Sequence, residues 1–174
     1  MLGVFDFTII PARSEAGYPE GMEVPEAVRY IARMKAEDCA LRAPEDALIL
    51  AADTVVSVDG RILEKPENEE DARRMLRLLS GRQHRVYTGL ALKQGQRVLC
   101  DCAHADVWFK PLSEAEISAY IATGMPMDKA GAYGAQDMAA LFVERIDGEF
   151  YTVVGLPMCQ LGKLLDRFGV SIWS

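Results

Sequence analysis

The stretch from Ile49 to Pro66 most constrains what this chain can fold into. A short apolar run ends abruptly on Asp53, and the Asp59-Gly60 pair beyond it favours a hairpin, because a two-residue turn needs positive φ angles. The hairpin would return Lys65 toward the Asp53 end. A carboxylate at the end of a buried strand either caps a turn or reaches a metal or polar substrate. On residue type alone both interpretations stay open.

The composition bounds the class of protein. With 174 residues, half of them hydrophobic, the chain is expected to form one compact domain over 1–174. A net charge of −7 argues against binding nucleic acid, which requires a concentrated basic surface. The four cysteines are scattered, and no signal peptide or membrane-length apolar run is visible. We therefore expect a cytoplasmic protein that binds neither nucleic acid nor membrane.

Helices and strands are expected to alternate along the chain. Predicted helices begin at Pro25, at Asn68 or Glu69, at Ser113 with Glu116 as a capping box, and after Pro157. Predicted strands lie at 5–10, in a hairpin over 54–63, in a long hairpin of 84–92 and 98–109, and in a last hairpin of 141–146 and 150–154. This pattern favours a mixed-sheet α/β domain over a purely parallel one.

Charged residues at the predicted ends of elements share a chemical logic: Glu15, Lys35, Asp53, Lys65 and Lys129. Two carboxylates can hold a hard divalent cation, which takes oxygen ligands and keeps waters and substrate phosphates. The lysines can neutralise a polyphosphate. Such a site favours phosphoryl or nucleotidyl chemistry, in which a metal lowers the pKa of an attacking water.

The segment 128–136 is rich in glycine and alanine around Lys129 and Gln136. This composition predicts a loop whose backbone is closely approached, as in loops that face a phosphate or a base. The two histidines, His84 and His104, have no catalytic or ligand partner at suitable spacing, so we expect both to make structural hydrogen bonds.

Other catalytic templates are missing from the sequence. It contains no GxxxxGK[ST] motif of a phosphate-binding loop and no GxSxG nucleophile motif. An aspartyl-phosphate phosphatase would place a second Asp two residues after the first, where this chain has Val55. No cysteine has a plausible histidine partner for nucleophilic hydrolysis.

Four stretches together resemble the Maf family of nucleoside triphosphate pyrophosphatases: residues 49–66, DARRMLRLLSGRQHRVYTG (71–89), DKAGAYGAQ (128–136) and VVGLP (153–157). They follow the family's order and spacing over nearly the whole chain. The resemblance implies an α/β fold like that of inosine triphosphate pyrophosphatase, with an elongated mixed central sheet, flanking helices and a cleft between two lobes, usually as a homodimer. It also implies hydrolysis of nucleoside triphosphates to the monophosphate and pyrophosphate with Mg²⁺ or Mn²⁺.

The resemblance assigns roles by motif position. Asp53 matches the proton acceptor and a metal ligand, and Glu15 matches a second metal ligand. The phosphate-facing lysines are Lys35, Lys65 and Lys129, and Thr54 and Gln136 match the markers of the subgroup that acts on dTTP and UTP. A glutamine side chain suits a thymine or uracil base, because an amide can both donate to and accept from an imide edge.

The chain departs from the family pattern at two places. Glu64 stands where the family usually has glycine, which puts a negative charge beside Lys65. The chain also begins just after the point where the family has a Ser-x-Ser-Pro-Arg-Arg loop, so it looks N-terminally truncated, and we expect a start further upstream. These departures leave a second hypothesis: a catalytically impaired nucleotide-binding protein with a regulatory role in cell division and septum formation.

Overall fold

The computed structural model describes residues 7–13, 17–19 and 21–171. The chain divides into two compact units, and each is assembled from separate segments. Unit 1 comprises 1–53, 89–102 and 158–174, and unit 2 comprises 54–88 and 103–157. That 1–174 behaves as a single domain stays a prediction.

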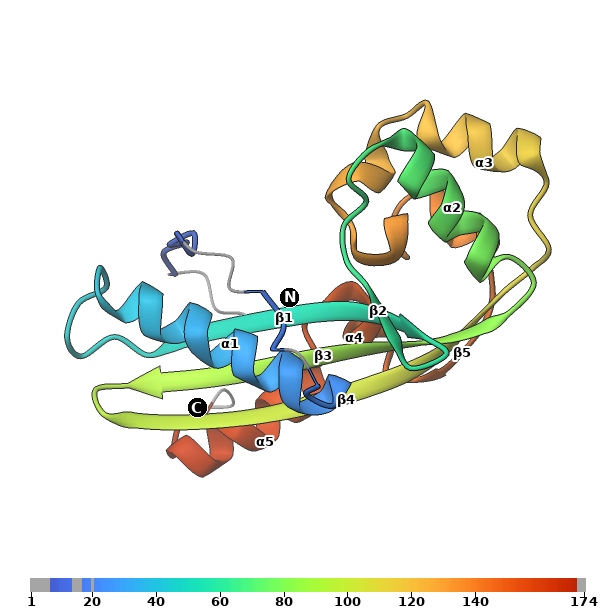
Figure 1. Ribbon diagram of the computed structural model, residues 1–174. Helices are drawn as coiled ribbons and strands as arrows, with labels where there is room; N and C mark the ends of the chain where they lie inside the picture. Colours follow the sequence, from blue (N-terminus) through green and yellow to red (C-terminus); the bar gives the residue numbers. More distant parts are fainter. Residues whose placement is uncertain (1–6, 14–16, 20, 172–174) are drawn as a thin grey trace. The chain divides into compact units, whose positions relative to one another are not determined.

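The α/β class predicted from the sequence is confirmed. The helices are α1 (Val24–Ala40), α2 (Glu69–Leu79), α3 (Glu114–Ile121), α4 (Phe150–Val154) and α5 (Met158–Phe168). The strands are β1 (Ile49–Val58), β2 (Arg61–Leu63), β3 (Gln83–Gln94), β4 (Arg97–Phe109) and β5 (Val143–Gly148). Short 3₁₀ turns lie at η1 (Met125–Asp128), η2 (Ala130–Ala132) and η3 (Met138–Phe142). The strands form one sheet in the order β2-β1-β3-β4-β5, with antiparallel pairing at both edges (Figure 1).

The hairpin predicted over 54–63 is confirmed. Strands β1 and β2 pair antiparallel, with Val56 opposite Leu63. The turn residues Asp59 (φ 52°) and Gly60 (φ 74°) both have positive φ angles, as the predicted two-residue turn requires. The strand does not end at Asp53, however. Because β1 runs on to Val58, Asp53 lies in its interior, and the interpretation of this residue as a turn cap is excluded.

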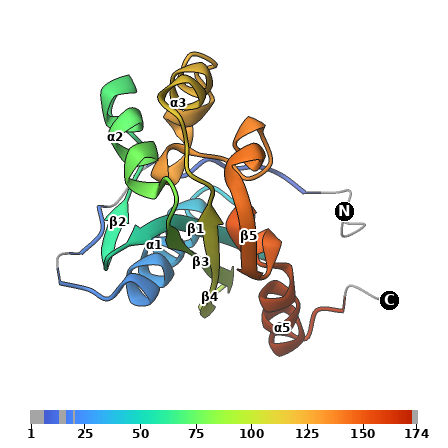
Figure 2. The ribbon, with the colours of Figure 1, turned by 90° about the vertical axis from the view of Figure 1, so that its right-hand side faces the viewer.

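Helix α1 packs against the sheet in unit 1 through small residues. Ala32 and Ala36 of α1 share a buried cluster with Ala91 of β3. At Gly89 the helix and strand approach so closely that a Cβ would lie 2.3 Å from the carbonyl oxygen of Val28. Helix α5 lies on the other side of these strands (Figure 2). It buries three leucines of the predicted apolar stripe: Leu161, Leu164 and Leu165.

The larger hydrophobic core belongs to unit 2. The apolar stripe predicted for α2 is buried in it: Ala72, Met75, Leu76 and Leu79. Helix α3 adds Ile117 and Tyr120, and the capping box of Ser113 and Glu116 predicted for its first turn is present.

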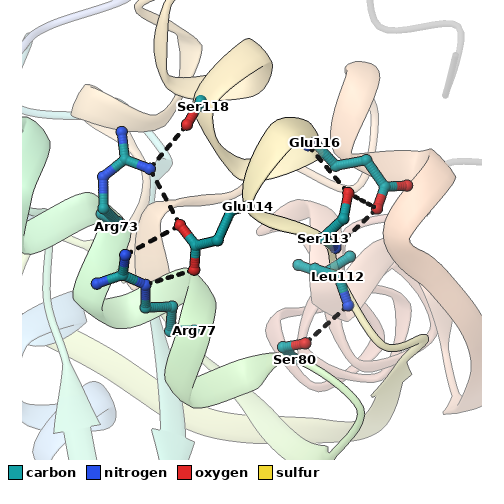
Figure 3. Close-up of polar contacts among 8 residues, drawn as sticks. All are labelled: Arg73, Arg77, Ser80, Leu112, Ser113, Glu114, Glu116 and Ser118. Carbon is teal, nitrogen blue, oxygen red and sulfur yellow. Dashed lines mark hydrogen bonds and ion pairs between the residues drawn. The ribbon is translucent and has the colours of Figure 1, made fainter.

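Polar contacts hold α3 against α2 in unit 2 (Figure 3). Arg77 donates to both carboxylate oxygens of Glu114, at 2.7 and 2.9 Å, and Arg73 donates to the Ser118 hydroxyl at 2.8 Å. The hydrogen bond from Arg77 lowers the pKa of Glu114. The Leu112 amide donates to the Ser80 hydroxyl at 2.7 Å, where α2 ends. The contacts of Arg73 and Arg77 are exposed, so they fix the register of the two helices more than they add to stability.

Two predicted strands are wrong. Residues 150–154 form helix α4, although their sequence FYTVV is rich in strand formers. Burial of Thr152 and Val153 on one side of this turn decides the outcome, and Gly155 ends it with a φ angle of 112°. Strand β5 pairs instead with β4, with Ile146 opposite Val107. The described part of the strand predicted at 5–10, residues 7–10, has no regular structure.

Candidate functional site

The carboxylate of Asp53 joins three segments of unit 1. The side chain is only 7% exposed. Its Oδ1 accepts a hydrogen bond from Lys35 Nζ at 2.6 Å, and its Oδ2 accepts one from the Tyr18 hydroxyl at 2.8 Å. Lys35 lies on α1 and Tyr18 lies in the loop that precedes it. The structure therefore brings together Asp53 and Lys35, two of the predicted site residues.

Sequence reasoning missed Tyr18. The residue lies between Gly17 and Pro19 in a loop with no helical or strand periodicity, so no pattern indicates where its side chain lies. Its hydroxyl is a neutral donor, whereas Lys35 is a cation, so Asp53 receives two hydrogen bonds of different kinds.

The described residues contain no group of three or more His, Cys, Asp or Glu side chains that could hold a metal ion. Asp53 offers one carboxylate, and Glu15, the other predicted ligand, lies outside the described residues. Each oxygen of Asp53 keeps a second lone pair beyond its hydrogen bond. Because Mg²⁺ is usually held by one or two carboxylates together with substrate phosphates, the donor chemistry of Asp53 fits a divalent cation.

Lys65 and Lys129 lie in unit 2 and act on the same carboxylate. Asp128 forms an ion pair with Lys129. The hydrogen bond from Lys129 is the main cause of the lowered pKa of Asp128, and the charge of Lys65 lowers it further. Sequence reasoning missed Asp128, although its position directly before Lys129 was a signal that the two charges could pair.

The loop that carries Lys129 is held against the β1–β2 hairpin at Gly131. The Gly131 amide donates to the carbonyl oxygen of Glu64 at 3.0 Å. Gly131 has a φ angle of 67°, and a Cβ there would lie 2.7 Å from Cγ2 of Val56. Within the protein, the group that lies closest to the loop backbone here is the side chain of Val56, and approach of a phosphate or a base to this loop stays a prediction. The Glu64 side chain is exposed.

Thr54 and Gln136, the predicted base-selecting residues, have different surroundings in unit 2. The Thr54 hydroxyl lies 2.9 Å from that of Thr88. Gln136 is exposed and makes no hydrogen bond with any residue that the structure describes. No hydrogen bond or ion pair between described residues joins either of them to another predicted site residue.

His84 connects β3 to the loop 128–136 inside unit 2. It is 3% exposed, and its Nε2 lies 2.8 Å from the Tyr133 hydroxyl. Burial lowers the pKa of His84 to about 4, so the ring is neutral at pH 7. Its Nδ1 has no hydrogen-bond partner among the described residues. His104 is exposed and packs against the Tyr87 ring. The structural hydrogen bond predicted for His84 is confirmed, whereas the His104 side chain makes a ring contact and no hydrogen bond with a residue that the structure describes.

A family model described as "Maf-like protein" matches residues 1–168. A protein of Dictyoglomus thermophilum is 46% identical over 170 residues, which cover 96% of this chain and 88% of the relative. One of Chromobacterium violaceum is 49% identical over 157 residues, which cover 84% of this chain and 78% of the relative. One of Alkaliphilus metalliredigens is 46% identical over 164 residues, which cover 92% of this chain and 84% of the relative. Each of these relatives is named dTTP/UTP pyrophosphatase.

Proposed function

Because this chain belongs to the Maf family, we propose that it is a nucleoside triphosphate pyrophosphatase that hydrolyses dTTP and UTP to the monophosphate and pyrophosphate. The observation that carries this proposal is the similarity over most of the chain to relatives that bear that one name. The candidate site supports it, because a buried carboxylate and several lysines suit hydrolysis of a polyphosphate.

In the proposed reaction a water molecule attacks the α-phosphorus of the nucleotide. Its oxygen forms the new bond to phosphorus, the bond from phosphorus to the α–β bridging oxygen breaks, and pyrophosphate leaves. Asp53 accepts the proton of the attacking water. Its hydrogen bonds from Lys35 and Tyr18 hold the carboxylate in one orientation for this transfer.

We propose that the remaining predicted residues bind the substrate. Lys35, Lys65 and Lys129 would neutralise phosphate charge, and Thr54 and Gln136 would face the base. Asp53 and Glu15 would hold Mg²⁺ or Mn²⁺, and this cation would supply Lewis-acid neutralisation of the phosphates.

We further propose that the protein acts in the cytoplasm as a homodimer. The four cysteines are scattered along the sequence and form no disulfide framework, which suits a reducing compartment. No helix among the described residues is long and apolar enough to cross a membrane. Exposed apolar side chains in unit 2, including Leu141, Phe150 and Tyr151, offer surface that a second copy could cover.

The activity is tested by measuring pyrophosphate released from a panel of nucleoside triphosphates in the presence of Mg²⁺ or Mn²⁺. The wild type should turn over dTTP and UTP. Asp53→Asn should lower kcat by at least about 100-fold, because an amide cannot accept the proton that a general base removes.

Asp106→Asn is the matched control. Asp106 is a strand aspartate that is also paired with a cation, Arg85, but it has no proposed role in the reaction. It should retain activity. Full activity in Asp53→Asn would overturn the role of Asp53, and nucleotide binding without turnover by the wild type would favour the regulatory alternative.

A further inference from the structure

Threonines from three segments of unit 2 form a short hydrogen-bonded chain. Thr54 lies in β1, Thr88 in β3 and Thr152 in α4. The hydroxyl oxygens of Thr54 and Thr88 are 2.9 Å apart, and the Thr88 hydroxyl donates to the carbonyl oxygen of Thr152 at 2.8 Å. Thr88 and Thr152 are fully buried, whereas Thr54 is partly exposed.

Counting protons shows which group donates each of these hydrogen bonds. A hydroxyl group has one proton to donate, and a carbonyl oxygen can only accept. The single proton of Thr88 is therefore committed to Thr152, and the proton between Thr54 and Thr88 must come from Thr54. With its proton directed at Thr88, Thr54 can offer only lone pairs to a ligand. Its hydroxyl receives no hydrogen bond from any other residue in the described part of the chain.

Gly155 also lies close to the Thr54 hydroxyl. A Cβ at this glycine would lie 3.2 Å from Thr54 Oγ1, closer than ordinary van der Waals contact. The absence of a side chain at Gly155 leaves the Thr54 oxygen free of steric crowding there. Thr152, whose carbonyl is the last acceptor in the row of hydrogen bonds, directly precedes the VVGLP motif. The motif also supplies Gly155, the glycine beside Thr54.

We propose that Thr88 is a positioning residue that makes Thr54 a pure hydrogen-bond acceptor and thereby selects bases that present an N–H group. The proposal rests on the proposed function, in which Thr54 faces the base. Uracil and thymine carry an imide N–H at ring position 3, whereas the same nitrogen of cytosine is an acceptor. A cytosine base would place one lone pair against another, which leaves two polar groups unpaired.

The test compares kcat/KM for UTP and CTP in the wild type and in Thr88→Val. Valine has nearly the shape of threonine but no hydroxyl, so in this variant the Thr54 hydroxyl can turn and donate to cytosine. The ratio of UTP to CTP kcat/KM should fall by about tenfold, the effect of one neutral hydrogen bond. The change should appear mainly as a lower KM for CTP, whereas a merely loosened core would lower kcat for both nucleotides.

Thr152→Val is the matched control. It removes a fully buried hydroxyl that has no partner among the described residues, but it keeps the backbone carbonyl that receives the hydrogen bond of Thr88. This variant and Thr88→Ser should both retain the wild-type ratio. An unchanged ratio in Thr88→Val, or an equal fall in Thr152→Val, would overturn the proposal.

A substrate change tests the same proposal if Thr88→Val does not fold. The wild type should lose at least about tenfold in kcat/KM on UTP methylated at ring nitrogen 3, which has no N–H, and should tolerate a methyl group on carbon 5. Equal use of the N-methylated nucleotide would overturn the proposal. Failure of the wild type to hydrolyse any nucleotide would instead overturn the proposed function, and the ratio of UTP to CTP dissociation constants would then test the selectivity.

Discussion

A buried carboxylate such as Asp53 is stable only where its charge is compensated. Lys35 compensates it directly, at 2.6 Å. Because the Tyr18 hydroxyl is neutral, its hydrogen bond adds no charge and mainly restricts rotation of the carboxylate. The two donors therefore make separable contributions, one to the charge of Asp53 and the other to its orientation.

Tyr18→Phe should lower kcat on dTTP by about 10- to 150-fold with little change in KM. The variant removes one hydrogen bond to a charged group, which contributes about 1.5–3 kcal/mol, and each 1.4 kcal/mol of barrier is about tenfold in rate. KM should change little because the hydrogen bond that is removed goes to Asp53, the proposed general base, and Tyr18 itself is not a proposed phosphate ligand. Steady-state kinetics provide the measurement.

Tyr30→Phe is the control for this prediction, because Tyr30 is an exposed tyrosine on α1 and has no part in the proposed site. It should behave as the wild type. A Tyr18→Phe variant with unchanged kcat would show that Lys35 alone orients the carboxylate.

Single residues differ in how far the sequence could predict them. Asp53 was predictable because a charge directly after an apolar run is unusual, and the family resemblance also marked Lys35. Tyr18 was not, because its contact with Asp53 joins positions 35 residues apart through an irregular loop. The threonine chain was hidden for a similar reason, since hydrogen bonds between three separate segments leave no periodic signal.

The contact between the loop of Lys129 and the β1–β2 hairpin is a close approach between elements of unit 2. It depends on the absence of a side chain at Gly131, and it places the backbone of that loop against Glu64, next to Lys65. Two of the proposed phosphate-binding lysines thus depend on one glycine for their relative position.

Gly131→Ala should destabilise the protein by about 2–5 kcal/mol. A left-handed φ angle costs an alanine about 1–2 kcal/mol, and crowding against Val56 adds an overpacking cost of about 1–3 kcal/mol. Urea unfolding gives the change in free energy. Turnover of dTTP should fall as well, because Lys129 moves with the loop.

Gly95→Ala separates these two costs. Gly95 also has a positive φ angle, but nothing lies within 4 Å of a Cβ built there, so only the cost of the φ angle, about 1–2 kcal/mol, should be lost. Adding Val56→Ala to Gly131→Ala should recover part of the packing cost. Equal destabilisation by the two glycine substitutions would contradict the crowding argument.

Whole elements were predicted well where their periodicity agreed with their burial. The stripe of α2 and the capping box of α3 are local signals, and both elements form where the sequence predicts them. The segment 150–154 failed because its strand-forming side chains are used in a helical turn, in which Thr152 and Val153 are buried. Tertiary packing overrode local propensity there.

For the molecule as a whole, His84 should make the free energy of unfolding decrease as the pH is lowered into the mildly acidic range. Its pKa is about 4 when folded against 6.5 as the ordinary value, so the unfolded chain takes up the proton first as the pH is lowered. Unfolding should therefore become easier by about 2 kcal/mol between pH 7 and pH 5. Urea unfolding at a series of pH values provides the measurement.

Carboxylates that are hydrogen-bonded in the folded protein change its stability at a lower pH than His84 does. Hydrogen bonds from Lys110 and Ser113 lower the pKa of Glu116 to about 2, so the stability that it contributes is lost below about pH 4.5. His84→Phe removes the titrating ring and should flatten the slope between pH 7 and pH 5 while the steeper acid slope remains. An unchanged slope in this variant would assign the effect to other groups.

The sequence indicates the class of this molecule and most of its helices, but it does not reveal the division into two units. Three of the four boundaries between the units fall inside β1, β3 and β4, each of which reads as one uninterrupted strand in the sequence. A change of packing partner along a continuous strand alters neither its alternation nor its turn residues, so no sequence pattern marks it.

Because each unit is made of separate segments of the chain, the two units are completed at different times during synthesis. Unit 2 needs no residue beyond Pro157, so all of its chain has been made before α5 is translated. Unit 1 includes both α1 and α5, near opposite ends of the chain, and it has to wait for the last helix. The Lys35–Asp53 pair is thus translated early, but the unit that surrounds it is completed only after α5 has been translated.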